Sequence, residues 1–205
     1  MGLEDFLKSG VGDFHDSRAD CIIKPENGAM WLVEEKIFDG VCLHHSGTFK
    51  ADTPKYIADY HVNTRGWAAI AYHVLVTKVG LVHLCKDPKY RGAHCGDTYG
   101  NKMYLAVCCE GNFTVEQPTA VQVRRLSEVL TAIEVWKGAG FKVMGHKSFV
   151  ATACPGNLLG VWQEYERKEW ERIQEEQRQQ EAERKEQRRK ARWFARLMAK
   201  LRRLE

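Results

Sequence analysis

A chain of 205 residues, 44% of them hydrophobic and 10% aromatic, is long enough for one well-buried domain with residues left over. The formal net charge of +4 is small for this length, and no apolar stretch approaches the roughly 18 residues of a membrane span, so composition favours neither a nucleic-acid-binding nor a membrane-spanning protein. Seven cysteines, an odd number behind a start without a secretory signal, indicate reduced thiols, and we expect synthesis in the cytoplasm without a signal peptide.

The first 38 residues are expected to form an N-terminal extension. Within it, the run "CIIKPENGAMWLV" is typical of a hairpin that turns at Asn27-Gly28 and adds to the edge of a sheet. Four later runs are short, rich in β-branched and aromatic residues and bounded by glycine, which predicts strands within 41–45, 71–85, 103–111 and 141–146. The second run is expected to fold back on itself at Val79-Gly80.

Two helices are predicted between these strands. Thr53 before Pro54 is the usual pair of N-cap and first helical residue, which predicts a helix within 52–63. A second helix is predicted within 114–140 and should end at Gly138. Its apolar residues recur at near-helical spacing: Val121, Leu126, Val129, Leu130, Ile133 and Trp136. Because strands and helices alternate, we predict an α/β domain over residues 39–160 whose helices cover a central β-sheet.

Residues 161–205 differ in composition from the domain, with many charges and few aliphatic side chains. The pairs Glu164/Lys168, Glu181/Lys185 and Glu186/Lys190 have the favourable i,i+4 order of an exposed helix. Its continuation is a basic amphipathic helix. The apolar stripe consists of Trp193, Phe194, Leu197, Met198, Leu201 and Leu204, opposite Arg192, Arg196, Lys200 and Arg203.

Three partners fit this last segment. It either docks on the domain or pairs with a copy of itself, or it contacts an anionic membrane or lipopolysaccharide. Incidental binding of nucleic acid through arginines is a weaker alternative, and no specific nucleic acid is expected. The charged helix is compatible with a monomer or a paired coil, so the sequence leaves the oligomeric state open.

The stretch "HKSFVATACPG" sets His146 and Cys154 eight positions apart. Both residue types suit zinc, and a zinc site that does chemistry keeps three protein ligands and one open position. The third ligand is expected from the pair His44-His45 at the end of a strand. Alternation sends these two side chains to opposite faces, so only one of them reaches the site, and the pattern does not say which.

Adjacent cysteines in the third strand run are a different case. Cys108 and Cys109 must face opposite sides of the sheet, so they cannot enter one metal site together. We expect both to be small buried hydrophobic residues.

Four blocks carry a family resemblance: "VCLHHSGT", "RGWAAIAYHVLV", "RGAHCGDTYGNKMYLAVCCEGN" and "GHKSFVATACPG". In this order they resemble the zinc-dependent N-acetylmuramoyl-L-alanine amidases of the type-2 amidase and peptidoglycan-recognition-protein family, particularly bacteriophage endolysins. The similarity covers residues 39–160. It implies a mixed sheet flanked by helices, a cleft at one edge, and Zn²⁺ bound by His44, His146 and Cys154.

The same resemblance implies a peptidoglycan hydrolase, most simply a phage or prophage lysin acting on the bacterial cell wall. It would cleave the amide bond between N-acetylmuramic acid and L-alanine of the stem peptide. Tyr72 matches the family's active-site tyrosine, and a phenol whose ordinary pKa is near 10 suits donation to an oxyanion. Thr152 stands where many phage members have lysine, as in animal recognition proteins that hydrolyse peptidoglycan; it can donate a hydrogen bond but brings no charge.

His94, Trp67 and Asn101 match positions that border or support the family's substrate groove, and we expect them to bind substrate. The alternative function is a non-catalytic peptidoglycan-binding or virion-associated module with the same fold. Because binding-only members often lack the cysteine ligand, the presence of Cys154 favours the enzyme.

Overall fold

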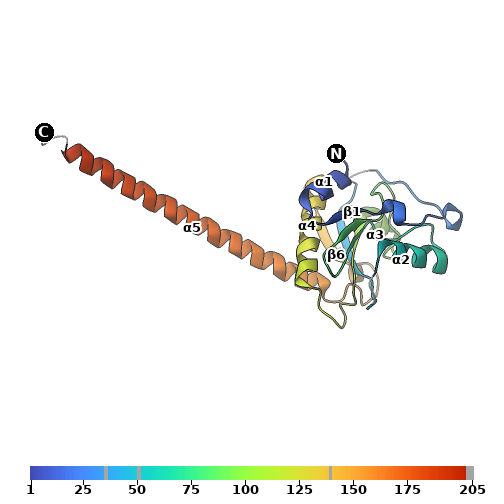
Figure 1. The fold of residues 1–205 in the computed structure, drawn as a ribbon. Coiled ribbons are helices and arrows are strands. Elements are labelled where there is room, and N and C mark those ends of the chain that lie inside the picture. Colours follow the sequence, from blue (N-terminus) through green and yellow to red (C-terminus); the bar gives the residue numbers. More distant parts are fainter. Residues whose placement is uncertain (35–36, 50–51, 139, 202–205) are drawn as a thin grey trace. The chain divides into compact units, whose positions relative to one another are not determined.

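The computed structural model describes residues 1–34, 37–49, 52–138 and 140–201 (Figure 1). The chain divides into two compact units, Met1–Gln163 and Glu164–Glu205. This division lies within three residues of the predicted boundary at 160/161, near the start of a long helix.

A six-stranded sheet forms the centre of the first unit. Its strands are β1 (Phe14–Asp16), β2 (Gly40–His45), β3 (Val74–Val76), β4 (Val82–Leu84), β5 (Tyr104–Cys109) and β6 (Lys142–Gly145), in the spatial order β1-β4-β3-β5-β2-β6. Neighbours are parallel except for the antiparallel pair of β3 and β4. The predicted reversal at Val79-Gly80 joins that pair, and Gly80 has a φ of +88°, which favours glycine. The mixed central sheet is therefore confirmed.

Five α-helices accompany the sheet in the described residues: α1 (Leu3–Gly10), α2 (Pro54–Asp59), α3 (Thr98–Met103), α4 (Ala120–Lys137) and α5 (Leu158–Leu201). Short helical turns lie at Arg18–Asp20, Pro25–Asn27, Tyr60–Thr64 and His146–Ser148. As predicted, Thr53 caps α2, since its hydroxyl accepts the N–H of Tyr56 at 3.2 Å. The predicted end of α4 at Gly138, with a φ of +92°, is also confirmed.

Two apolar clusters pack on the two faces of the sheet. On one face, α1 and α4 (side by side in Figure 1) cover the larger cluster, which contains Leu7, Trp136 and Leu43. Each large side chain buried there contributes about 1.5–3 kcal/mol. On the other face, α2 adds Ile57 to a smaller cluster. Cys109 belongs to the first cluster and Cys108 to the second, each fully buried, which confirms that they face opposite sides.

Residues 1–34 are an integral part of the first unit. Leu3 and Leu7 of α1 are buried in the larger cluster, and β1 adds a parallel edge strand beside β4. The predicted hairpin around Asn27-Gly28 is wrong. Pro25–Asn27 forms a 3₁₀ turn, and the Asn27 amide donates to the carbonyls of Val62 and Trp67 at 3.1 and 3.2 Å. Proline favours such a turn because its φ is fixed, and these long-range bonds replace strand pairing.

The second unit is the long part of α5 that follows Gln163. The three predicted ion pairs form along it, with N···O distances of 3.2 Å (Glu164 to Lys168), 2.8 Å (Glu181 to Lys185) and 3.4 Å (Glu186 to Lys190). Among the described residues, no helix combines the length and the apolar character that crossing a membrane requires.

Candidate functional site

The register of β2 and β6 brings two of the predicted ligands together. These parallel strands pair Leu43 with Gly145, so the next residues, His44 and His146, lie beside each other at the carboxyl edge of the sheet. Their ring centroids are 4.5 Å apart. Cys154 completes the group, and one ligand atom from each of the three residues lies within 4.8 Å of the others.

A closed loop returns Cys154 to this edge. The N–H of Lys147 donates to the carbonyl of Cys154 at 3.0 Å, and the N–H of Cys154 donates to Thr152 Oγ1 at 3.2 Å. Gly156 lets the loop lie against Phe113: its φ is +64°, and an added Cβ would lie 2.2 Å from the Phe113 backbone. The hydrogen bonds before Cys154 and the close packing of Gly156 after it therefore both position the Cys154 thiol.

Strand alternation did not show which of His44 and His45 faces the site. In the structure, the two side chains lie on opposite faces of the sheet. His44 is 1% exposed and lies on the sheet face that carries Tyr72, with ring centroids 5.3 Å apart. His45 is half-buried on the other side, where its Nδ1 accepts the N–H of Phe113 at 3.1 Å. Only His44 joins His146 and Cys154.

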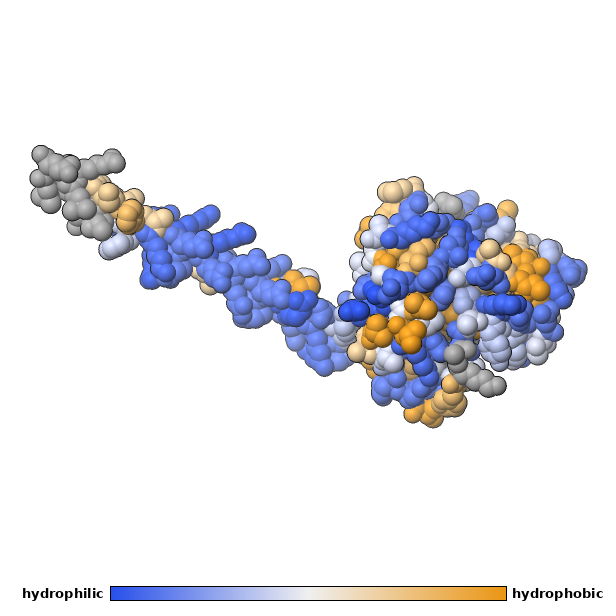
Figure 2. All heavy atoms as spheres, viewed as in Figure 1, coloured by the Kyte–Doolittle hydropathy of each residue, from blue (hydrophilic) through white to orange (hydrophobic). Residues whose placement is uncertain are grey.

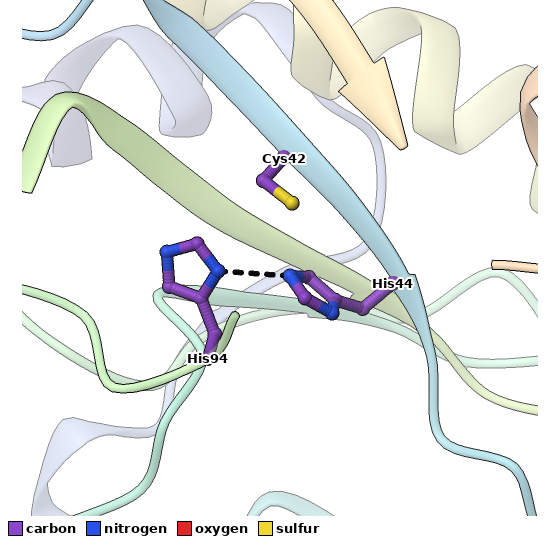
Figure 3. A group of neighbouring side chains, drawn as sticks. All are labelled: Cys42, His44 and His94. Atoms are coloured by element: carbon purple, nitrogen blue, oxygen red, sulfur yellow. Dashed lines mark hydrogen bonds between the residues drawn. The ribbon is translucent and has the colours of Figure 1, made fainter. Parts of the chain in front are cut away.

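Hydrogen bonds determine which nitrogen of His44 carries its proton, and Figure 3 shows the one that joins His44 to His94. His94 Nε2 lies 3.2 Å from the carbonyl oxygen of Tyr104, which can only accept, so His94 carries its proton there. Its Nδ1 is then an acceptor, and His44 Nε2, at 2.9 Å, donates to it. The lone pair of a neutral His44 is left on Nδ1, which lies 3.7 Å from Cys154 Sγ. Burial holds the pKa of both imidazoles well below the usual value, which favours these neutral forms.

The distances fit a zinc ion. With Zn–S near 2.3 Å and Zn–N near 2.0–2.1 Å, a tetrahedral ion places sulfur and nitrogen ligands about 3.6 Å apart, close to the observed separation of His44 Nδ1 and Cys154 Sγ. His146 Nε2 is buried without a hydrogen-bond partner in the described part of the chain, which leaves a ligand atom to be satisfied. Burial raises the pKa of the Cys154 thiol to about 11, so a nearby cation would be needed to hold the thiolate.

A second group, Cys42, His44 and His94, also brings ligand atoms together (Figure 3). Its two nitrogens are 2.9 Å apart, which is a hydrogen-bond distance and shorter than the roughly 3.3 Å between two nitrogens on a tetrahedral zinc ion. Cys42 is fully buried, and that burial raises the pKa of its thiol far above the usual value. We therefore interpret His94 as a residue that orients His44, and Cys42 as a buried neighbour of the two histidines.

A cleft of about 370 Å³ is lined by Tyr72, whose ring centroid lies 5.3 Å from that of His44. Its lining consists of Ser46, Thr48, Asp52, Tyr56, Ile57, Tyr60, His61 and Tyr72. Burial raises the pKa of Tyr72 well above its usual value, so the phenol stays protonated and can donate at neutral pH. Asp52 is 2% exposed; its Oδ2 accepts from Thr48, while Oδ1 has no hydrogen-bond partner among the described residues.

His61 is a site residue that the sequence analysis did not single out. Its ring stacks on Trp67 at 4.7 Å and meets the edge of Tyr72 at 5.5 Å. Its Nδ1 accepts the N–H of Ala71 at 3.2 Å, and burial lowers its pKa to about 4. A neutral His61 thus packs against Tyr72, the predicted active-site tyrosine. The available signal was a histidine near the end of a predicted helix, four residues before the start of "RGW".

The three residues expected to bind substrate occupy different places. Asn101 Oδ1 accepts the N–H groups of His94 and Cys95 at 2.7 and 3.0 Å, so it holds the His94 loop. His94 is 7% exposed and contacts His44, as described above. Trp67 is half-buried and lines a separate cavity of about 210 Å³. Substrate binding by these residues stays a prediction, and the contacts of the first two are those of supporting residues.

A comparison with known protein families identifies the family of this chain. The profile of a family described as N-acetylmuramoyl-L-alanine amidase matches residues 34–157, more than half of the chain. The chain belongs to this family. The matched range contains His44, Tyr72, His146 and Cys154.

Relatives with curated names agree with this assignment. Peptidoglycan-recognition protein SD of Drosophila simulans is 27% identical over 151 residues, which cover 70% of this chain and 80% of that protein. The human N-acetylmuramoyl-L-alanine amidase is 32% identical over 114 residues. That match covers 52% of this chain but 19% of the human protein, so it concerns one region of a much longer relative.

Solved structures show the same fold. The Ph2119 endolysin of a Thermus scotoductus MAT2119 bacteriophage superposes with a TM-score of 0.60 and 26% identity, over 67% of this chain and 89% of the endolysin. The Drosophila recognition protein SD superposes with a TM-score of 0.57 and 25% identity, over 66% and 84% of the two chains. The predicted type-2 amidase fold, a mixed sheet flanked by helices, is confirmed.

Proposed function

We propose that this protein is a zinc-dependent amidase that cleaves the bond between N-acetylmuramic acid and the L-alanine of the peptidoglycan stem peptide. The observation that carries the proposal is the convergence of His44, His146 and Cys154 beside Tyr72 and its cleft. The amidase name of the human relative and the endolysin structures support the substrate class.

The three ligands suit a hydrolytic metal site. Two neutral imidazoles and one thiolate would leave a bound zinc ion with about one positive charge and an open coordination position. Zinc bound there supplies a Lewis acid that activates water near neutral pH and polarises a carbonyl oxygen. The chain itself contributes the orientation of its ligands: the His94 hydrogen bond sets the proton of His44 on Nε2 and presents Nδ1.

Two hydroxyl groups would act on the substrate. Tyr72 keeps its proton and can donate it in a hydrogen bond to the oxyanion that forms when the amide becomes tetrahedral. This bond accelerates the reaction only to the extent that it is stronger to the oxyanion than to the planar amide. The Thr152 oxygen accepts the N–H of Cys154, and a hydroxyl group that accepts one hydrogen bond can also donate one.

The cleft offers contacts for the stem peptide and the sugar. Tyr56 and Tyr60 expose 49% and 47% of their surface at its rim, where aromatic rings can pack on a sugar face. We infer a lysin of phage or prophage origin that acts on the bacterial cell wall.

A release assay on purified cell walls tests the proposal. The wild-type protein should release dye-labelled wall fragments and new L-alanine amino termini, lose this activity with a chelator and regain it with zinc. Cys154→Ala should abolish release while retaining wall binding. Cys109→Ala, which removes a buried thiol on the opposite sheet face, is the matched control and should retain activity. Wall binding without release by the zinc-loaded wild type would instead establish the non-catalytic module.

A further inference from the structure

The charge along α5 changes at Glu186. Before this residue, arginines are paired within the helix: Arg167 with Glu164 and Glu171, Arg172 with Glu169 and Glu176, and Arg178 with Glu175. From Gln187 to Leu204 the sequence has no acidic residue. It has eight basic residues instead: Arg188, Arg189, Lys190, Arg192, Arg196, Lys200, Arg202 and Arg203. This segment therefore carries a concentrated positive charge on a chain whose formal net charge is only +4.

The same segment exposes large apolar side chains. Trp193, Phe194 and Met198 are 64%, 57% and 39% exposed, and orange atoms follow the blue, hydrophilic stretch of α5 in Figure 2. At about 100° per residue, these three side chains span an arc of about 140°. Arg188, Arg192 and Arg196 follow one another at four-residue steps around the opposite side.

From this arrangement we propose that residues 187–201 bind the surface of a bilayer that contains anionic phospholipids. The helix would lie in the plane of the headgroups, with Trp193 and Phe194 in the acyl boundary and the arginines on lipid phosphates. The proposal does not depend on catalysis, because the segment lies wholly outside the unit that contains the metal ligands.

Other partners of residues 187–201 would account for only one of the segment's two features, the basic side or the apolar side. A nucleic acid would be attracted to the arginines but would leave the two aromatic side chains in water. A paired coil needs apolar residues every 3.5 positions over three to four heptads, and residues 164–186 interrupt any such pattern with charged residues. A bilayer surface contacts both sides of this short helix: the acyl boundary takes up the apolar side chains, and the lipid phosphates bind the arginines.

Co-sedimentation of the full chain with lipid vesicles tests the proposal. Binding should be strong to vesicles of phosphatidylethanolamine and phosphatidylglycerol at 3:1, and at least tenfold weaker to phosphatidylcholine. The triple variant Arg188→Gln, Arg192→Gln, Arg196→Gln should bind the anionic vesicles about a hundredfold more weakly, from about 1 kcal/mol per basic residue at an anionic surface. Trp193→Ser with Phe194→Ser should lose at least tenfold while keeping the same charge.

The matched control is the triple variant Arg167→Gln, Arg172→Gln, Arg178→Gln, which removes the same charge from the paired part of the helix and should bind within twofold of wild type. Circular dichroism of every variant checks that α5 is intact. Equal losses in the two triple variants, or binding to duplex DNA without binding to vesicles, would overturn the proposal. So would a concentration-dependent dimer that Trp193→Ser dissociates in the absence of lipid.

Discussion

At the scale of single residues, His94 has contacts that suggest a role besides the predicted one. It was expected to bind substrate, and it accepts a hydrogen bond from His44 at 2.9 Å while donating to a backbone carbonyl. If His44 binds zinc as proposed, a partner that fixes its tautomer acts through the metal ligand, and direct contact with substrate stays a prediction.

His94→Ala should therefore weaken zinc binding by about 10- to 100-fold, the usual effect of removing such a partner. Competition with a chromogenic chelator measures the change. Asn101→Ala removes the acceptor that holds the His94 loop and should produce a smaller loss in the same assay. If zinc affinity is unchanged in His94→Ala while substrate affinity falls, the histidine contacts substrate and the tautomer argument is wrong.

Local sequence patterns account for some of these side-chain positions and not for others. Strand alternation showed that one of His44 and His45 must face the site, and the family resemblance selected His44. The contacts of His61 and His94 could not be predicted, because they join residues 10 to 50 positions apart through tertiary packing. No local pattern distinguishes a buried histidine that orients a ligand from one that fills the core.

At the scale of elements, the loop from His146 to Gly156 positions two of the three predicted metal ligands, His146 and Cys154. Gly156 has a φ of +64°, and a Cβ there would meet the Phe113 backbone. Since backbone cannot move aside as a side chain does, a larger residue must displace the loop that carries Cys154.

Gly156→Ala should lower the free energy of unfolding by about 1–3 kcal/mol through strain at a left-handed position. It should also weaken zinc binding, since the thiol moves with the loop. Gly160→Ala is the matched control: it lies in α5 with no atom within 4 Å of an added Cβ, and it should leave stability unchanged or raise it by up to about 1 kcal/mol. Urea unfolding and zinc titration measure both effects, and normal zinc affinity in Gly156→Ala would contradict the positioning role of this loop.

The elements that sequence reasoning identified are those with strong local signals. The apolar runs and the Thr53-Pro54 cap determine β2 to β6 and α2 locally, and the apolar spacing does so for α4. Residues 1–34 lacked such signals. Strand β1 is three residues long and exists because it pairs with β4, and the expected hairpin was wrong because Asn27 bonds to the segment after α2.

At the scale of the whole molecule, buried neutral histidines make stability depend on pH. His73 is fully buried: its Nδ1 accepts the N–H of Ala106 at 3.0 Å and its Nε2 donates to the carbonyl of Tyr90 at 2.9 Å. Burial lowers its pKa to about 3. Because the unfolded side chain titrates near 6.5, the unfolded state binds more protons below that pH, and stability falls as pH falls.

Between pH 6.5 and pH 4, His73 alone should remove roughly 3 kcal/mol from the free energy of unfolding. Urea unfolding at several pH values, with chelator present to exclude metal effects, measures this loss. His73→Gln should be less stable at pH 7 but should show a pH dependence smaller by one proton. A wild-type stability that stays constant over this range would show that His73 titrates normally.

The central claim is that His44, His146 and Cys154 hold a single zinc ion. Zinc-edge X-ray absorption on protein loaded with one equivalent of zinc tests it most directly, because sulfur and nitrogen neighbours differ in distance. We predict one sulfur near 2.3 Å in wild type and in Cys42→Ala, and none in Cys154→Ala. Loss of the sulfur signal in Cys42→Ala, or its persistence in Cys154→Ala, would contradict the account.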